Sequence, residues 1–245
     1  IEEMVTALEE NDSDVSIIPY YRTIGKIAII KFRRNSAFYE NQIIFNETFI
    51  NKYLQSFCGW GEFPVSIWGK LYKKDLLWDI KLSELTYGED ICFNLQVLPR
   101  AKKMAIASKA HYYYRWGGVT TNIKECIFDD AIKQYLIKKK YFETYGAYDC
   151  IEKVNAELCN FFISYVDYAI IKYPKEILKK ELSCYISNPY LQQASKNVSF
   201  QWFNQNDTYN AIKKKKIDDL IAIRKRQAFK TKIKREIYEI LSYFL

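Results

Sequence analysis

The glycines of this chain lie only in its first part. All eight occur at or before Gly146, and residues 147–245 contain none. Glycine supplies the left-handed backbone angles that tight turns require, and it weakens helices. The distribution therefore predicts a turn-rich α/β region followed by a helical one, in which only Pro174 and Pro189 interrupt the pattern.

The first region alternates short apolar patterns of helical and strand period. Helical spacing predicts helices at 1–11, 46–57, 68–77 and 88–98, and β-rich runs predict strands at 14–21, 26–32, 103–107 and 111–115. Such alternation is typical of a largely parallel or mixed sheet covered by helices. We expect an α/β fold over residues 1–122, followed by an all-helical C-terminal region.

Charge divides the second region. Residues 123–207 are expected to form a helical extension, with helices at 124–144, 147–172 and 174–187. Residues 208–245 form a tail, of which 211–245 carry eleven Lys and Arg against four Asp and Glu, while the whole chain has a net charge of +8. Apolar residues recur there at three- and four-residue steps, which predicts a basic amphipathic helix.

Composition excludes several common kinds of functional site. His111 is the single histidine, so the chain cannot form a multi-histidine metal site, and it lacks the phosphate-binding loop and the dinucleotide-binding glycine motif. The six cysteines form no C-x-x-C pair and lie mostly among apolar residues, which favours a reduced, cytoplasmic setting. No signal peptide is visible, and no apolar run approaches the roughly 18 residues of a membrane span.

Residues 63–122 contain the residue types of a sugar-transfer site. Glu89 and Asp90 form a carboxylate pair that opens a predicted helix after a Thr-Tyr-Gly turn. Trp68 and Lys70 place an aromatic face and a cation at the start of another predicted helix, and Arg115 ends a predicted strand.

Three blocks in this segment resemble the family 2 inverting glycosyltransferases (GT-A type) of bacterial surface-polysaccharide synthesis. They are W-G-K-L-Y-K-K-D-L-L (68–77), G-E-D-I-C-F-N-L (88–95) and Y-Y-Y-R (112–115), and the resemblance covers residues 1–122. It implies a nucleotide-sugar donor, a glycan or lipid-linked acceptor, and a divalent cation, Mg or Mn. It also implies that Asp90, the aspartate of the Glu-Asp pair, is the general base.

The chemistry of such a transfer is compatible with these residues. A carboxylate must take the proton of the acceptor hydroxyl, and a helix N-terminus keeps that carboxylate ionised. Glu89 would assist Asp90, since negative charge favours an oxocarbenium-like transition state. The leaving diphosphate needs cations, for which Lys70 and Arg115 are candidates, and Trp68 offers a flat face for a sugar.

Each of these residues also has a purely structural interpretation. Glu89 would close a capping box on the Thr86 amide, and Asp90 would be an ordinary first-turn acid. Trp68 would be a core residue, and Lys70 a solvated helical side chain. Arg115 would form an ion pair with a structural acid, and His111 would be a structural histidine rather than a metal or phosphate contact.

The family's metal-binding D-x-D motif has no convincing counterpart here. Asp12 and Asp14 form the triplet Asp-Ser-Asp, but they follow a predicted helix, where Asp and Asn are ordinary turn residues. We therefore expect no metal ligands in this chain. We also expect the chain to be the acceptor-side half of the catalytic domain without the nucleotide-binding half, and to be inactive alone.

A second functional hypothesis rests on the tail, residues 208–245. A basic amphipathic helix binds anionic membrane surfaces, so the chain would act as a membrane-surface or scaffold module on the inner face of the plasma membrane. The structural alternative is that its apolar stripe packs on helices 124–187 and its lysines are solvated. Nucleic-acid binding is not expected, because the chain has no recognised motif for it.

Overall fold

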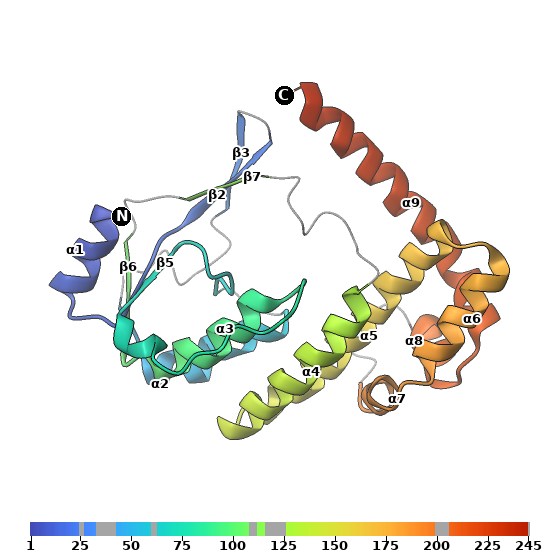
Figure 1. The fold of residues 1–245 in the computed structure, drawn as a ribbon, viewed down its shortest axis with the longest axis horizontal. Helices are drawn as coiled ribbons and strands as arrows, with labels where there is room; N and C mark the ends of the chain where they lie inside the picture. The colour runs from blue at the N-terminus through green and yellow to red at the C-terminus, as the bar shows by residue number, and fades with distance from the viewer. Residues whose placement is uncertain are drawn as a thin grey trace.

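The computed structural model describes residues 1–24, 27–32, 43–59, 63–107, 112–115, 126–198 and 206–244. Its N-terminal part combines strands and helices, and its C-terminal part is helical (Figure 1). The expected fold class, a mixed α/β sheet with helices followed by a helical region, is thus confirmed. No helix in these ranges is both long enough and apolar enough to cross a membrane.

The larger sheet has four strands in the order β4-β6-β1-β5. The central pair, β1 (Val15–Ile17) and β6 (Lys103–Ile106), is parallel, and the outer strands β4 (Ile43–Phe45) and β5 (Lys70–Tyr72) run antiparallel to them. All three residues of β1 are buried, as expected for a strand covered on both faces. The sheet is therefore mixed and its centre lies in the core.

A smaller sheet of three strands has the order β3-β2-β7. Its strands are β2 (Tyr20–Ile24), β3 (Ile27–Phe32) and β7 (Tyr112–Arg115), with β7 parallel to β2. The single strand expected at 14–21 is divided between the two sheets at Pro19. Proline has no N–H to donate to a ladder, but the Pro19 carbonyl accepts from the Tyr112 amide at 3.0 Å.

The prediction of a helix at 68–77 is wrong. Lys70–Tyr72 forms strand β5, and a short 3-10 helix, η4 (Lys74–Leu77), follows it. Gly69, with φ +73°, turns the chain into this strand, and its carbonyl accepts from the Ile18 amide at 2.9 Å. Pairing with β1, which lies more than fifty residues earlier in the sequence, overrides the local helical spacing.

The other helices expected in the first part are present. They are α1 (Glu2–Glu10), a continuous helical segment made of α2 (Asn46–Thr48), η2 (Phe49–Tyr53) and η3 (Leu54–Cys58), and α3 (Glu89–Val97), which continues into η5 (Leu98–Arg100). Phe49, Phe57 and Leu95 are fully buried in one core that continues into the helical part. The two parts therefore share a hydrophobic core.

The helical part is built on two long helices that pack side by side, α4 (Ile127–Thr144) and α5 (Tyr148–Lys172) (Figure 1). Around them lie α6 (Lys175–Ile186), α7 (Pro189–Lys196), α8 (Asn206–Lys213) and α9 (Ile217–Phe244). The single helix expected at 208–245 is interrupted between α8 and α9, where Lys215 has a φ of +54°. Helix α7 was not expected.

Candidate active site

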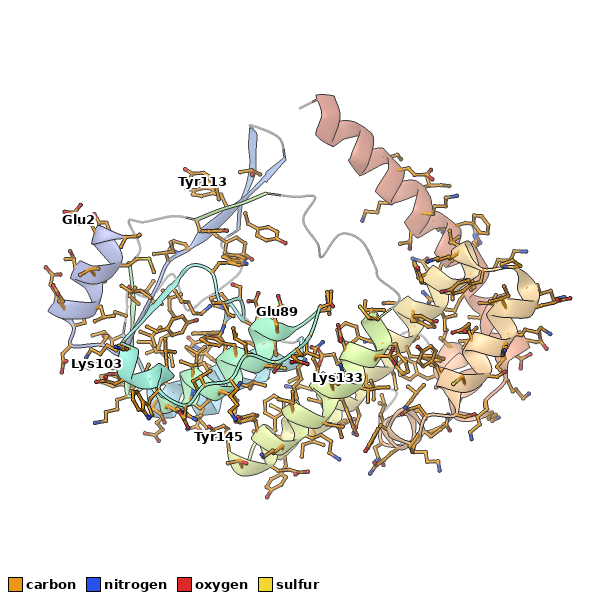
Figure 2. All side chains as sticks on the ribbon, in the orientation of Figure 1. Glu2, Glu89, Lys103, Tyr113, Lys133 and Tyr145 are labelled. Atoms are coloured by element: carbon orange, nitrogen blue, oxygen red, sulfur yellow. The ribbon has the colours of Figure 1, made fainter. Side chains whose placement is uncertain are left out.

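Asp90 lies in the first turn of α3, which begins directly after Gly88. Gly88 has a left-handed backbone, with a φ of +88°. Its Oδ1 accepts a hydrogen bond from the Ile67 amide at 3.1 Å. This bond joins the start of α3 to the loop that leads into β5. Figure 2 shows the neighbouring Glu89 at the same end of α3. The Asp90 carboxylate thus lies at the positive end of the helix dipole of α3.

Lys70, the first residue of β5, lies beside this carboxylate. Its Nζ donates to the Ser66 carbonyl oxygen at 2.5 Å. Desolvation of the ammonium group lowers the pKa of Lys70 to about 7, and the negative charge of Asp90 opposes this shift. Lys70 lies in a strand, is half-buried and is hydrogen-bonded to the backbone, so the alternative of a solvated helical side chain is wrong. Lys70 and Asp90 bind the two ends of one peptide group, the Ser66 carbonyl and the Ile67 amide.

Asn94 fixes the same side of α3, one turn after Asp90. It is fully buried, its Oδ1 accepts from the Tyr72 hydroxyl at 2.8 Å, and its Nδ2 donates to the Val65 carbonyl at 2.9 Å. Asp90 and Asn94 are four residues apart and share a helix face, so two anchors hold this face against the 63–72 segment. Asn94 lies within the 88–95 block but was not recognised as important.

The turn that precedes α3 is held by helix α4. Oδ2 of the buried Asp130 accepts hydrogen bonds from the Thr86 and Tyr87 amides, both at 3.0 Å, and Gln134 Nε2 donates to the Tyr87 carbonyl at 2.7 Å. The capping box considered for Glu89 is thus wrong, because the Thr86 amide is bonded to Asp130. No side chain caps α3.

Gly88 is required by this arrangement. A Cβ added at Gly88 would lie 2.2 Å from Gln134 Cδ, in addition to the strain of a positive φ. Asp130 and Gln134 were not predicted as site residues. They lie more than forty residues after the turn and carry no motif, so no local sequence signal identifies them.

Trp68 packs among tyrosines of the smaller sheet. Its ring stacks with those of Tyr112 and Tyr114, at centroid distances of 4.6 and 5.1 Å, and meets Tyr20 edge to face at 4.9 Å. Aromatic pairs at such distances are stabilising. Trp68 therefore connects the loop beside Asp90 to β2 and β7. Such packing is what the alternative of a structural role for Trp68 predicts.

The remaining predicted residues divide into two groups. Arg115 ends β7 and its backbone pairs with Thr23, but its side chain and the whole of His111 lie outside the described residues. Asp14 Oδ2 accepts from the Lys102 amide at 2.7 Å, and Asp12 pairs with Lys73 at 3.3 Å. These two carboxylates thus have structural partners away from α3.

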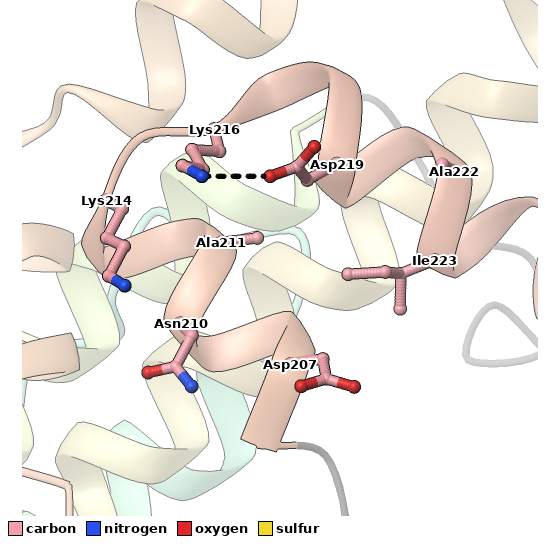
Figure 3. A pocket seen from close by; sticks show the side chains of 8 residues that line it. All are labelled: Asp207, Asn210, Ala211, Lys214, Lys216, Asp219, Ala222 and Ile223. Atoms are coloured by element: carbon pink, nitrogen blue, oxygen red, sulfur yellow. Dashed lines mark ion pairs between the residues drawn. The ribbon is translucent and has the colours of Figure 1, made fainter.

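Two hollows in the described part of the chain lie away from Asp90. One, of about 460 Å³, lies at the junction of α8 and α9, where Lys216 and Asp219 form an ion pair of 3.5 Å (Figure 3). The other, of about 330 Å³, lies between the 50–55 segment and the start of α5. Neither includes a residue predicted for the site.

The mixed sheet, the helices around it and the helical C-terminal part together form a glycosyltransferase-like fold. The crystal structure of residues 1–349 of S. aureus TarS, a glycosyltransferase, matches this chain with a TM-score of 0.51 and 16% identity, covering 92% of this chain and 62% of that one. Its complex with UDP-GlcNAc matches equally, with 63% of that chain covered. The chain thus spans less than two thirds of this neighbour's length.

The likeness to TarS is one of fold. No protein-family model and no curated protein matches the sequence. At 16% identity, this likeness assigns no role to individual residues.

Proposed function

We propose that this chain is part of a glycosyltransferase that moves a sugar from a nucleotide-sugar donor to a glycan or lipid-linked acceptor with inversion. The observation that supports this most directly is the placement of Asp90. Its carboxylate lies at the N-terminus of α3, is held by the Ile67 amide and has Lys70 beside it, within a glycosyltransferase-like fold. The UDP-GlcNAc complex of TarS makes a uridine diphosphate sugar the first donor to test.

In the proposed reaction Asp90 is the general base. It takes the proton of the acceptor hydroxyl while that oxygen forms its bond to the anomeric carbon from the side opposite the diphosphate. The bond from that carbon to the diphosphate oxygen breaks, and the electron pair leaves with the diphosphate. One displacement of this kind inverts the configuration, and proton transfer to a placed carboxylate contributes about 10²- to 10⁴-fold in rate.

The neighbouring residues have supporting roles in this proposal. Lys70 adjusts the charge around Asp90, and Glu89 adds negative charge that stabilises an oxocarbenium-like transition state. Arg115 and His111 are proposed contacts of the donor diphosphate, and Trp68 shapes the acceptor side through its tyrosine partners.

A divalent cation, Mg or Mn, belongs to the proposal only for the complete enzyme. Asp12 and Asp14 do not fit such an ion, because Lys73 and two backbone amides occupy their carboxylates. Within the described ranges no three His, Cys, Asp or Glu residues converge as a metal site. The ligands are therefore expected from outside the residues described, and no step above is routed through the ion.

The test replaces Asp90 by Asn in the full-length protein that carries this sequence. Turnover of UDP-GlcNAc with a glycan or lipid-linked acceptor should fall at least about 100-fold, while calorimetry shows unchanged donor affinity. Asp75→Asn, an exposed carboxylate in η4, is the matched control and should retain full activity. Equal turnover of Asp90→Asn and the control would refute the assignment.

A further inference from the structure

Helix α9 has one face that is bound to the rest of the protein. Leu220 and Ala228 are buried, and α9 packs along α5. Between Leu220 and Ala228, Arg224 forms a bidentate ion pair with Asp167 of α5. The Nε–Oδ1 distance is 2.9 Å and the Nη2–Oδ2 distance is 2.6 Å. Part of the predicted apolar stripe therefore does pack on the helical extension.

A second apolar face of α9 is exposed. Phe229, Ile233 and Ile237 have exposed fractions of 47%, 55% and 52%, and Ile223, about 1.7 turns before Phe229, has 40%. At 3.6 residues per turn, Phe229, Ile233 and Ile237 span about 80° of the helix, centred roughly 180° from the buried face. This outer face consists of these four residues, on a helix whose later part extends beyond the bundle (Figure 1).

Cations lie on both sides of the outer face and between its apolar residues. At the same spacing of about 100° per residue, Lys225 and Lys232 lie along one edge and Lys234 beyond the other, while Arg226 and Lys230 lie between the apolar positions. Residues 225–237 carry six Lys and Arg and one acid, Glu236. Long basic side chains can extend their charged ends away from an apolar surface while their stems cover it, so this arrangement can bury the outer face and keep the charges at a polar boundary.

We propose that the outer face of α9 docks on the surface of an anionic lipid bilayer. The isoleucines and the phenylalanine would enter the boundary between headgroups and acyl chains, and the flanking cations would meet the lipid phosphates. A second copy of this chain is the competing occupant, but it would bring the same excess of positive charge to the contact. Charge complementarity therefore selects the anionic bilayer. This inference goes beyond the proposed function and does not depend on it.

The test measures co-sedimentation of the purified chain with vesicles of phosphatidylcholine alone and of equal parts phosphatidylglycerol and phosphatidylcholine. Binding is expected only to the anionic vesicles, and it should weaken as salt is raised toward 1 M, where the Debye length is about 3 Å. Phe229→Ser/Ile233→Ser/Ile237→Ser should abolish binding. Lys230→Glu/Lys232→Glu should lower the partition coefficient at least roughly tenfold.

Two matched controls separate the outer face from general properties of the chain. Lys175→Glu/Lys180→Glu changes the net charge by the same amount at exposed positions of α6, and Ile177→Ser removes an exposed isoleucine there. Both should bind as the unchanged protein does, and circular dichroism should show all variants folded. The proposal is overturned if the serine variant binds normally, if both lysine pairs act equally, or if ultracentrifugation without lipid shows a dimer that the serine substitutions dissolve.

Discussion

Asp130 accepts a hydrogen bond from the amide of Tyr87, although 43 residues separate them in the sequence. The same carboxylate oxygen accepts from the Thr86 amide, so a residue of the helical part holds the turn from which α3 and Asp90 begin. Asp130 is almost fully buried, with 4% of its surface exposed. These two amides therefore satisfy a carboxylate oxygen that is buried.

Replacing Asp130 by Asn should destabilise the protein and loosen this turn. The amide side chain loses the charge of the acceptor, and a buried hydrogen bond to a charged group contributes about 1.5–3 kcal/mol. Urea unfolding should show a loss of that order. Asp129→Asn, at the exposed neighbouring position, is the control and should change stability by less than about 1 kcal/mol. Similar losses in both variants would contradict the role given to Asp130.

Gly88→Ala should be more destabilising than a backbone effect alone explains. The new Cβ would collide with the Gln134 side chain, and a left-handed backbone costs a residue with a Cβ about 1–2 kcal/mol. Gly146→Ala measures the cost of the left-handed backbone alone. Gly146 has a φ of +65°, and a Cβ added there would meet no atom within 4 Å. Thermal unfolding of the two variants should differ by the cost of the collision. Adding Gln134→Ala should recover part of that difference, whereas equal melting temperatures for the two alanine variants would exclude the collision.

The stability of the protein should rise with pH above neutrality because of Lys70. Its pKa is about 7 in the folded protein and near 10.5 in the unfolded chain, so the unfolded chain binds more protons between these values. The free energy of unfolding gains on the order of 2 kcal/mol from this group between pH 7 and about pH 9. Urea titrations at both values should show the gain in the unchanged protein but not in Lys70→Met. Lys74→Met, an exposed lysine in η4, should retain it.

Lys138→Met should cost about 3 kcal/mol of stability, because it leaves Glu157 without its cation. The Lys138 Nζ–Glu157 Oε2 distance is 2.6 Å, and the Lys138 side chain is 1% exposed. Adding Glu157→Leu should restore most of the loss, since an apolar pair can replace a buried ion pair. Lys133→Met on the exposed side of α4 serves as the control in urea unfolding. A double variant no more stable than Lys138→Met would disprove the coupling.

Local patterns predicted most of the fold. The glycine distribution indicated the division into two parts, and the turn at Gly88 followed by two acids placed the start of α3 correctly. Strand β5 was missed because its conformation is decided by pairing with β1, far away in sequence. No proline or glycine marks the point where the tail helix is interrupted, so the left-handed backbone of Lys215 could not be predicted from the sequence.

The candidate site was predictable only in part. Short blocks singled out Asp90 and Lys70, which bind the Ile67 amide and the Ser66 carbonyl of one peptide group, and their roles stay a prediction. Asp130, Gln134 and Asn94 were not identified, because their importance lies in hydrogen bonds to segments distant in sequence. Such contacts leave no periodicity or spacing that a single sequence can display.

The bonds from Asp130 and Gln134 to the turn before α3 also determine where this protein can be recombined with a relative. A crossover near residue 122 would join an α3 turn from one parent to an α4 helix from another. The α4 helix of the second parent would need, at position 130, a side chain that accepts hydrogen bonds from the amides of residues 86 and 87. At position 134 it would need a side chain that leaves room for Gly88. Chimaeras that keep the 86–88 turn and helix α4 from the same parent should therefore preserve the geometry around Asp90, and the helical part cannot be treated as an interchangeable module.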